Sequence, residues 1–110
     1  MNKQFAIPGD RIRQLVPAMG SCLITDRVTV AGHKIGYMYR EEPDRPEDSG
    51  WRFFSGEESQ DFVDDPSNIG LYAVNTAANY DPDIIPYLDT PAPCAFEKSA
   101  GKYRRVDDAS

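Results

Sequence analysis

The stretch of sequence that decides the fold is EEPDRPEDSGWRFFSGEESQDFVDD, residues 41–65. An apolar block, residues 50–54, lies there between two acidic flanks, and the stretch holds ten acids but only two bases. Carboxylates at this density repel one another and belong in water, whereas the only tryptophan of the chain and the two phenylalanines beside it belong in a core. The pattern therefore predicts a core strand with an acidic surface at each end. The carboxylates that we expect to bind a partner are Glu41, Glu42, Asp44, Glu57, Glu58, Asp61, Asp64 and Asp65.

The aromatic side chains of that strand are expected to be structural. Side chains alternate between the two faces of a strand, so Trp51 and Phe53 point one way, and Arg52 and Phe54 point the other way. We assign Trp51 and Phe53 to the core, which leaves one aromatic side chain for exposure on the opposite face. The prolines and acids of residues 42–50 predict an irregular surface loop before the strand.

Length and charge narrow the class of protein. A chain of 110 residues can form one domain with a single core, and it has no room for a second domain. The net charge of −6 and the scattered bases speak against nucleic acid as a partner, because phosphate contacts need clustered lysines and arginines. The one local group of bases is too small to change this expectation: Lys98, Lys102, Arg104 and Arg105.

No segment of the sequence predicts export, membrane insertion or a bound cofactor. Residues 1–8 lack the apolar core of a signal peptide, and no run approaches the ~20 apolar residues of a membrane span. We therefore expect a cytoplasmic protein without a membrane partner. Cys22 and Cys94 match no metal or disulfide pattern and are interpreted as reduced, buried thiols. His33 is the only histidine, so we expect no metal site.

Before the aromatic strand, the pattern predicts one short helix and then several strands. Asp10 can cap a helix with helically spaced apolar residues, which Pro17 limits to a couple of turns. Residues 22–25, 28–30 and 34–40 have the composition and alternation of strands, and we expect them to form an antiparallel meander. The apolar positions of the expected helix are Ile12, Leu15, Val16 and Met19.

After the aromatic strand, the elements are shorter. Ser55 and Glu58 fit a capping box for an acidic helix toward Val63, and a turn follows at residues 65–68. Residues 71–80 have both helical and strand-like spacing, and we favour a helix because two adjacent alanines are good helix formers.

The last part of the chain predicts a capped turn and a hairpin. Asp81 can cap a new helix with Pro82 at its first position, and Pro86 should interrupt that helix within about a turn. Residues 94–98 and 103–106 then predict a closing hairpin.

The sequence contains few candidates for catalytic groups. The serines lack a nucleophile motif, and the acids do not match the spacing of a calcium loop. Carboxylate pairs such as Glu57 and Glu58 could serve a glycoside hydrolase, but a domain of this size has little room for a sugar cleft. The turn after residue 78 is the alternative site for a small ligand, formed by Asn79, Tyr80, Asp81 and Asp83.

Four consecutive motifs resemble those of the bacterial immunity protein 33 family, long catalogued as a domain of unknown function. They are CLITDRVTV (22–30), GYMYREEPD (36–44), DSGWRFFSG (48–56) and NTAANYDPDIIP (75–86). The resemblance implies an α+β fold and neutralisation of a bacterial toxin by direct binding. It implies no catalytic residues.

From these observations we expect a single α+β domain, a mostly antiparallel sheet with short helices. Residues 1–21 would be an N-terminal extension with a short helix, 22–106 the immunity protein 33-like domain, and 107–110 a frayed tail. The expected function is non-enzymatic binding of a cognate, basic toxin through the acidic surface. The alternative is a stand-alone housekeeping domain that binds a small ligand or regulates another protein.

Overall fold

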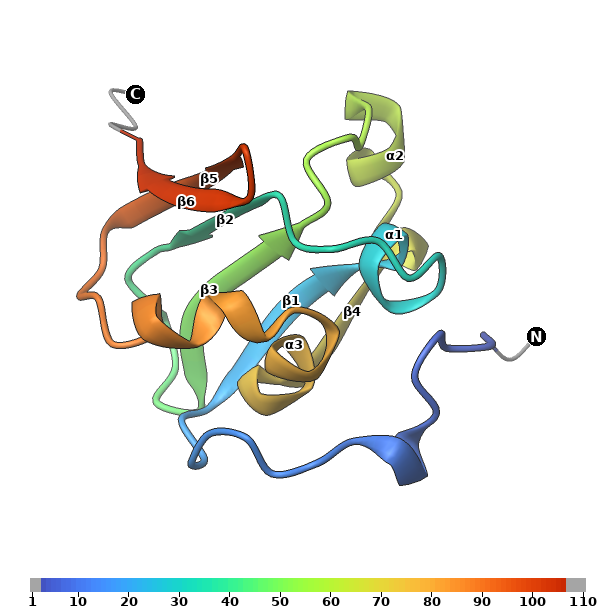
Figure 1. Ribbon diagram of the computed structural model, residues 1–110, viewed down its shortest axis with the longest axis horizontal. Coiled ribbons are helices and arrows are strands. Elements are labelled where there is room, and N and C mark those ends of the chain that lie inside the picture. Colours follow the sequence, from blue (N-terminus) through green and yellow to red (C-terminus); the bar gives the residue numbers. More distant parts are fainter. Residues whose placement is uncertain (1–2, 107–110) are drawn as a thin grey trace.

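The sheet is built around β3 (Asp48–Phe54), the strand that the aromatic block forms (Figure 1). The computed structural model describes residues 3–106. Six strands lie in the order β4-β1-β3-β2-β5-β6, and four of their five pairings are antiparallel. The predicted single α+β domain with a mostly antiparallel sheet is therefore confirmed. The other strands are β1 (Ser21–Thr25), β2 (Tyr37–Arg40), β4 (Ile69–Ala73), β5 (Cys94–Ser99) and β6 (Lys102–Arg105).

The helices are short, and α3 and η3 lie over one face of the sheet (Figure 1). α2 lies beyond the ends of β1 and β3. In the described residues, no helix is long and apolar enough to cross a lipid bilayer. The α-helices are α1 (Asp26–Thr29), α2 (Gln60–Asp64) and α3 (Val74–Tyr80), and the 3-10 helices are η1 (Gly9–Arg11), η2 (Pro66–Asn68) and η3 (Pro82–Tyr87).

The order of the strands shows that the expected meander is wrong. β1 pairs in parallel with β3 and antiparallel with β4, and β2 lies on the far side of β3. The reason is that α1 follows β1 directly and carries the chain away before it returns as β2, antiparallel to β3. Parallel neighbours need a crossover connection of this kind, which a meander of hairpins does not provide.

The strand expected at residues 28–30 is also wrong, because this segment belongs to α1 and its C-terminal cap. Val28 and Thr29 are fully buried. The carbonyl of Thr29 accepts a hydrogen bond of 2.9 Å from the hydroxyl of Tyr80 and one of 2.7 Å from the N–H of Ala6. Burial and long-range bonding in this turn of helix therefore override the strand propensity of β-branched residues.

The N-terminal segment, residues 3–20, is extended where a helix was expected. Only η1 is helical, so the predicted helix through Ile12 and Met19 is wrong. Side chains of Asn75 and Asn79 on α3 bind the backbone of the segment at 2.7–3.1 Å, and these bonds replace those that a helix would form within itself. The backbone groups bound in this way belong to Arg13, Leu15 and Val16.

The core lies between the sheet and the helices, as the alternation of β3 predicts. Trp51 is 0% exposed and Phe53 is 1% exposed, so both side chains lie in the core. The two rings stack with centroids 5.7 Å apart. They pack with fully buried apolar residues from the neighbouring strands and from α1, α3 and η3, namely Ile24, Met38, Val28, Val74, Ala77 and Ile84.

Two boundaries around β3 differ from the prediction. β3 begins at Asp48, so the last three residues of the expected loop 42–50 belong to the strand. The carboxylate of Glu58 does accept a hydrogen bond of 2.8 Å from the N–H of Ser55. However, α2 begins only at Gln60 and is capped by Ser59, so the predicted capping box holds the turn before the helix.

The remaining elements largely follow the sequence. The predicted helix over 71–80 is half right, because β4 extends to Ala73 and α3 begins at Val74. Asp81 caps η3 as predicted, but η3 continues through Pro86 to Tyr87, since a 3-10 helix of this length tolerates the proline. The hairpin of β5 and β6 is confirmed. The predicted frayed tail, residues 107–110, lies outside the described residues.

Candidate functional site

The two faces of the sheet differ in what covers them. α1, α3 and η3 pack on the face that carries Trp51 and Phe53. We call the opposite face the open face. The register places side chains of four adjacent strands in one row across it, and the outermost of them, Leu71, is 66% exposed. The row consists of Leu71, Leu23, Arg52 and Tyr39.

Three aromatic rings form the apolar centre of the open face. Tyr37 and Tyr39 on β2 and Phe54 on β3 have ring centroids 5.8–6.1 Å apart. All three are half-buried, so each presents part of its ring to solvent. Aromatic rings provide a large contact area with few rotatable bonds and are enriched at protein interfaces.

Arg52 lies on the open face beside this cluster, held by two carboxylates. Its guanidinium donates to Glu41 at 2.8 Å and to both carboxylate oxygens of Asp48, at 2.8 and 3.0 Å. The side chain is only 12% exposed, and the hydrogen bonds that it donates to Asp48 raise the pKa of Arg52 further. The same contact holds the pKa of Asp48 at about 2, with help from the N–H of Gly50. Arg52 is therefore a fixed charge on the open face, and the carboxylates that hold it lie toward the start of β3.

The depressed pKa of Asp48 predicts a dependence of stability on pH. A carboxylate whose pKa is lowered on folding stabilises the protein above its unfolded pKa, and this contribution is lost as the pH falls through the folded pKa. For Asp48 that window runs from about pH 4 to about pH 2. In Asp48→Asn, the free energy of unfolding should therefore fall less over this window than in the wild type.

Urea titrations at pH 4 and pH 2 measure this effect. The difference between wild type and Asp48→Asn should shrink as the pH is lowered. A difference of the same size at both pH values would mean that the pairing with Arg52 has no effect on stability. Asp10→Asn, at an exposed position on η1, is the matched control.

At the other end of β3, the open face leads into a cavity of about 500 Å³. Its apolar wall is made by Tyr37, Phe54 and Val63, and its polar wall includes Glu57, Glu58, Glu97 and Lys98. Burial raises the pKa of Glu58, but hydrogen bonds from the Thr25 hydroxyl and from the backbone N–H groups of Ser55, Glu58 and Gly56 outweigh it, so the pKa is lowered. Glu58 therefore remains charged near neutral pH and fixes the turn that forms one side of the cavity.

The structure divides the predicted acidic residues among several places. Glu41 lies at the Arg52 end of the open face, and Glu57 and Glu58 line the cavity at its other end. The others are exposed, either in the loop before β3 or on α2 and the cap of η2. These are Glu42, Asp44, Asp61, Asp64 and Asp65. Whether any of them binds a partner stays a prediction.

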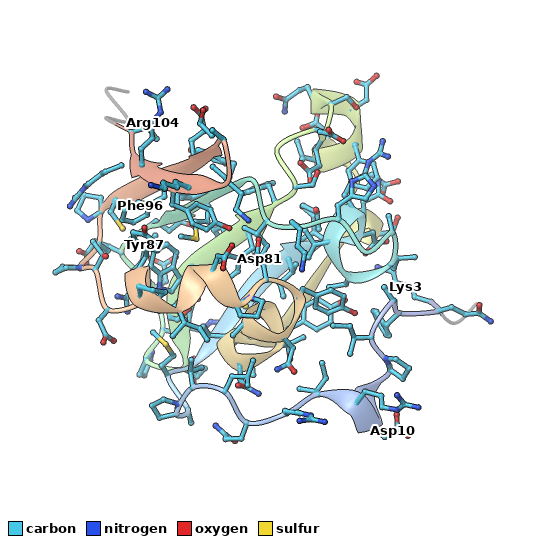
Figure 2. All side chains as sticks on the ribbon, in the orientation of Figure 1. Lys3, Asp10, Asp81, Tyr87, Phe96 and Arg104 are labelled. Atoms are coloured by element: carbon cyan, nitrogen blue, oxygen red, sulfur yellow. The ribbon has the colours of Figure 1, made fainter. Side chains whose placement is uncertain are left out.

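The four residues of the alternative ligand site have separate structural partners. Asn79 binds the N-terminal segment, and the Tyr80 hydroxyl binds the carbonyl of Thr29. Asp81 is 2% exposed and lies between η3 and the sheet (Figure 2). Of the four, only Asp83 is well exposed, at 67% of its side chain. Ligand binding by this turn also stays a prediction.

Asp81 is the centre of a buried polar network. Its Oδ2 accepts hydrogen bonds from the Lys98 ammonium at 2.6 Å, the Ile35 N–H at 3.1 Å and the Tyr103 hydroxyl at 3.2 Å. Its Oδ1 accepts from the N–H of Asp83 at 3.2 Å. The network joins η3 to β5 and β6, so its role is to hold the hairpin on the body of the protein.

Among the described residues, no three of the histidine, cysteine, aspartate and glutamate side chains gather as a metal site requires. Both cysteines are free and buried, as predicted, and burial raises the pKa of each thiol. Neither thiol is thus available as a nucleophile at neutral pH.

Sequence reasoning missed the aromatic centre of the open face. The alternation of Tyr37 and Tyr39 with Met38 was visible, and Phe54 was assigned to the face opposite Trp51. What the sequence did not show is that β2 pairs with β3 in a register that brings these three rings together. Leu71 was missed because its segment was taken for a helix.

Comparison with known proteins gives one family. The family model described as "Immunity protein Imm33 domain" matches residues 22–107, which include the six described strands except for Ser21 at the start of β1. No curated protein and no solved structure matched the chain.

Proposed function

The chain belongs to the Imm33 family of immunity proteins, and from this premise we propose that it neutralises a cognate bacterial toxin by binding it, without catalysing a reaction. The proposal places the protein in the cytoplasm, with a protein as its partner rather than nucleic acid or a membrane. Its net charge of −6 fits a basic toxin.

The observation that carries this proposal is the composition of the open face. An apolar centre of Tyr37, Tyr39 and Phe54 lies between charged groups at the two ends of β3. Protein interfaces have this arrangement, in which an apolar core provides the affinity and a polar rim provides specificity. The acidic residues predicted from the sequence would thus form the rim, and the aromatic rings would form the centre.

The charges would act mainly on the rate of association. Exposed carboxylates attract a basic partner over a distance of about 10 Å at 0.1 M salt, and this attraction weakens as salt is added. Glu58 keeps its charge and adds to this attraction, but its carboxylate already accepts hydrogen bonds from Thr25, Ser55 and Gly56, which leaves it less able to bond a partner directly. The exposed carboxylates near it, Glu57 and Asp61, are better placed to steer a partner.

The gene neighbourhood supplies the first test, because a toxin-like reading frame beside the gene of this chain is what the proposal expects, and the protein that it encodes is the partner to use. Cells that express that protein alone should stop growing, and cells that also express this chain should grow and yield a complex of the two. Tyr37→Ala with Phe54→Ala should abolish both protection and the complex, whereas Leu15→Ala, an exposed apolar residue of the N-terminal segment, should abolish neither. Growth arrest in the presence of the folded chain would rule the proposal out.

Neutralising the exposed acids should slow the association. Glu57→Gln with Asp61→Asn is expected to lower the association rate on the order of 10-fold at low salt and to leave the dissociation rate almost unchanged. Stopped-flow or surface plasmon resonance at two salt concentrations measures this. Asp10→Asn with Asp89→Asn makes the same change of net charge on η1 and just after η3, away from the open face, and should have a small effect. Equal effects of the two pairs would exclude local steering by α2 and the turn before it.

A further inference from the structure

The outer edge of β4 is one of the two edges of the sheet. The N–H of Val74 donates to the carbonyl of Gly20, so the backbone groups of Val74 face β1. Backbone groups alternate along a strand, which turns those of Ile69, Leu71 and Ala73 away from β1. Ser21, the register partner of Ala73, likewise turns its N–H away from β4. This N–H donates to the carbonyl of Glu47, on the side of β3.

Within residues 3–106, the N–H of Ile69 donates to the carbonyl of Pro66, and the carbonyl of Ala73, the N-cap of α3, begins the bonding of that helix. The outward groups left without a backbone partner in this range are the carbonyl of Ile69, both groups of Leu71 and the N–H of Ala73. The N-terminal segment approaches β4 only through side chains, where the ring of Phe5 meets the ring of Tyr72 and Lys3 bonds the carbonyl of Ser67. An edge with free N–H and C=O groups is a template for another strand.

The sequence of β4 lacks the features that protect an edge strand. It reads IGLYA, without a charge or a proline, and Leu71 is 66% exposed. The other edge is different, because β6 reads KYRR and three of its four residues are basic. Charged residues on an edge prevent pairing between sheets, so only the β4 edge is open to it.

We propose that β4 pairs antiparallel with β4 of a second copy of this chain, about a two-fold axis through Leu71. Leu71 would then lie opposite Leu71 of the other copy, Ile69 opposite Ala73, and Gly70 opposite Tyr72. Each large side chain meets a small one, except for the two leucines at the axis. The ring of Tyr72 already lies over Gly70 of its own strand, where a Cβ atom would meet the ring at 2.6–2.8 Å.

A second copy suits this edge better than a charged partner. Two copies of a chain of net charge −6 repel each other, and β4 is an uncharged strand through which they can meet. Pairing of identical strands also closes as a symmetric dimer, which leaves no further edge for growth at β4. The aromatic centre of the open face remains accessible in such a dimer, so the pairing is independent of toxin binding.

The decisive variant is Ala73→Pro. Ala73 is exposed and has φ −71°, a value that proline adopts without strain, and its N–H faces the edge. Proline removes that donor and places its ring where the second strand would lie, while the ladder between β1 and β4 stays complete. Ala73→Ser keeps the N–H and is the matched control.

Sedimentation equilibrium of the isolated wild-type chain should show a dimer that forms between about 1 µM and 1 mM, as a short pairing edge predicts. Ala73→Pro should weaken it at least tenfold with an unchanged melting temperature, and Ala73→Ser should not. Leu71→Lys, which would place two ammonium groups opposite each other at the axis, should abolish it. A wild-type chain that stays monomeric at 1 mM, or an Ala73→Pro variant that dimerises like the wild type, would overturn the proposal.

Discussion

Replacement of Trp51 by alanine is expected to lower the free energy of unfolding by about 3–5 kcal/mol. The indole is fully buried, stacks on Phe53 at 5.7 Å and lies under the guanidinium of Arg40 at 5.6 Å. Its N–H donates to the carbonyl of Leu88 at 3.1 Å. Alanine would leave a cavity between the sheet and η3 and would remove one donor to the Leu88 carbonyl, which would keep its 3.3 Å bond from the Arg40 guanidinium. Because a domain of this size is stabilised by about 5–15 kcal/mol, much of the protein would unfold.

Urea unfolding followed by circular dichroism measures this loss. Trp51→Phe retains most of the packing and loses the hydrogen bond to Leu88, so it should cost clearly less than the alanine variant. Phe54→Ala removes an aromatic ring of the same strand from the open face, where the ring is only half-buried, and should also cost less. An alanine variant at position 51 with the wild-type melting temperature would show that the indole is not part of the core.

Replacement of Asp81 by alanine is expected to cost about 3–5 kcal/mol. From the sequence alone, the loss of a helix cap predicts only about 0.5–2 kcal/mol. The structure raises this value, because the variant would leave the Lys98 ammonium without its closest partner and would leave the N–H of Ile35 unsatisfied in the core. Removing one member of a buried charge pair lowers the free energy of unfolding far more than removing one member of an exposed pair.

Asp83→Asn is the control for this prediction, since Asp83 is well exposed and its carboxylate lies 3.7 Å from the same ammonium. Its effect on stability should be close to zero. A double-mutant cycle adds a second check: Asp81→Ala combined with Lys98→Met should cost less than the sum of the two single variants, because the second change removes the stranded charge. A cost for Asp81→Ala as small as that of an exposed cap would mean that the network around Lys98 does not stabilise the fold.

The parts of the fold that could be predicted depend on neighbours in sequence. Trp51 and Phe53 were assigned to the core because alternation along one strand separates them from Arg52. The hairpin of β5 and β6 and the cap at Asp81 were likewise predictable, since a few consecutive residues determine each of them.

The parts that failed depend on partners far along the chain. The N-terminal segment has helical spacing, but Asn75 and Asn79, about 60 residues away, bind its backbone in an extended form. The parallel pairing of β1 with β3 depends on where α1 directs the chain. Spacing within a segment contains no information about either.

The candidate site was predicted in part. Charge density located the carboxylates at both ends of β3, but it treated them as one kind of residue. The structure separates Glu58, whose carboxylate holds a turn, from Glu57, which is exposed. The aromatic centre required the register of β2 against β3, which no local pattern determines.

The attachment of the N-terminal segment has a consequence for how this protein can evolve. Asn75 and Asn79 bind main-chain atoms, which are the same for every amino acid, and the segment's side chains that pack in or against the core are those of Ile7, Val16 and Met19. Mutations at exposed positions such as Arg11 and Arg13 should therefore accumulate without loosening the segment. Sequence comparison depends on amino-acid identity, so it is expected to detect similarity only from about Cys22 onward. The folded domain nevertheless includes the segment that precedes Cys22.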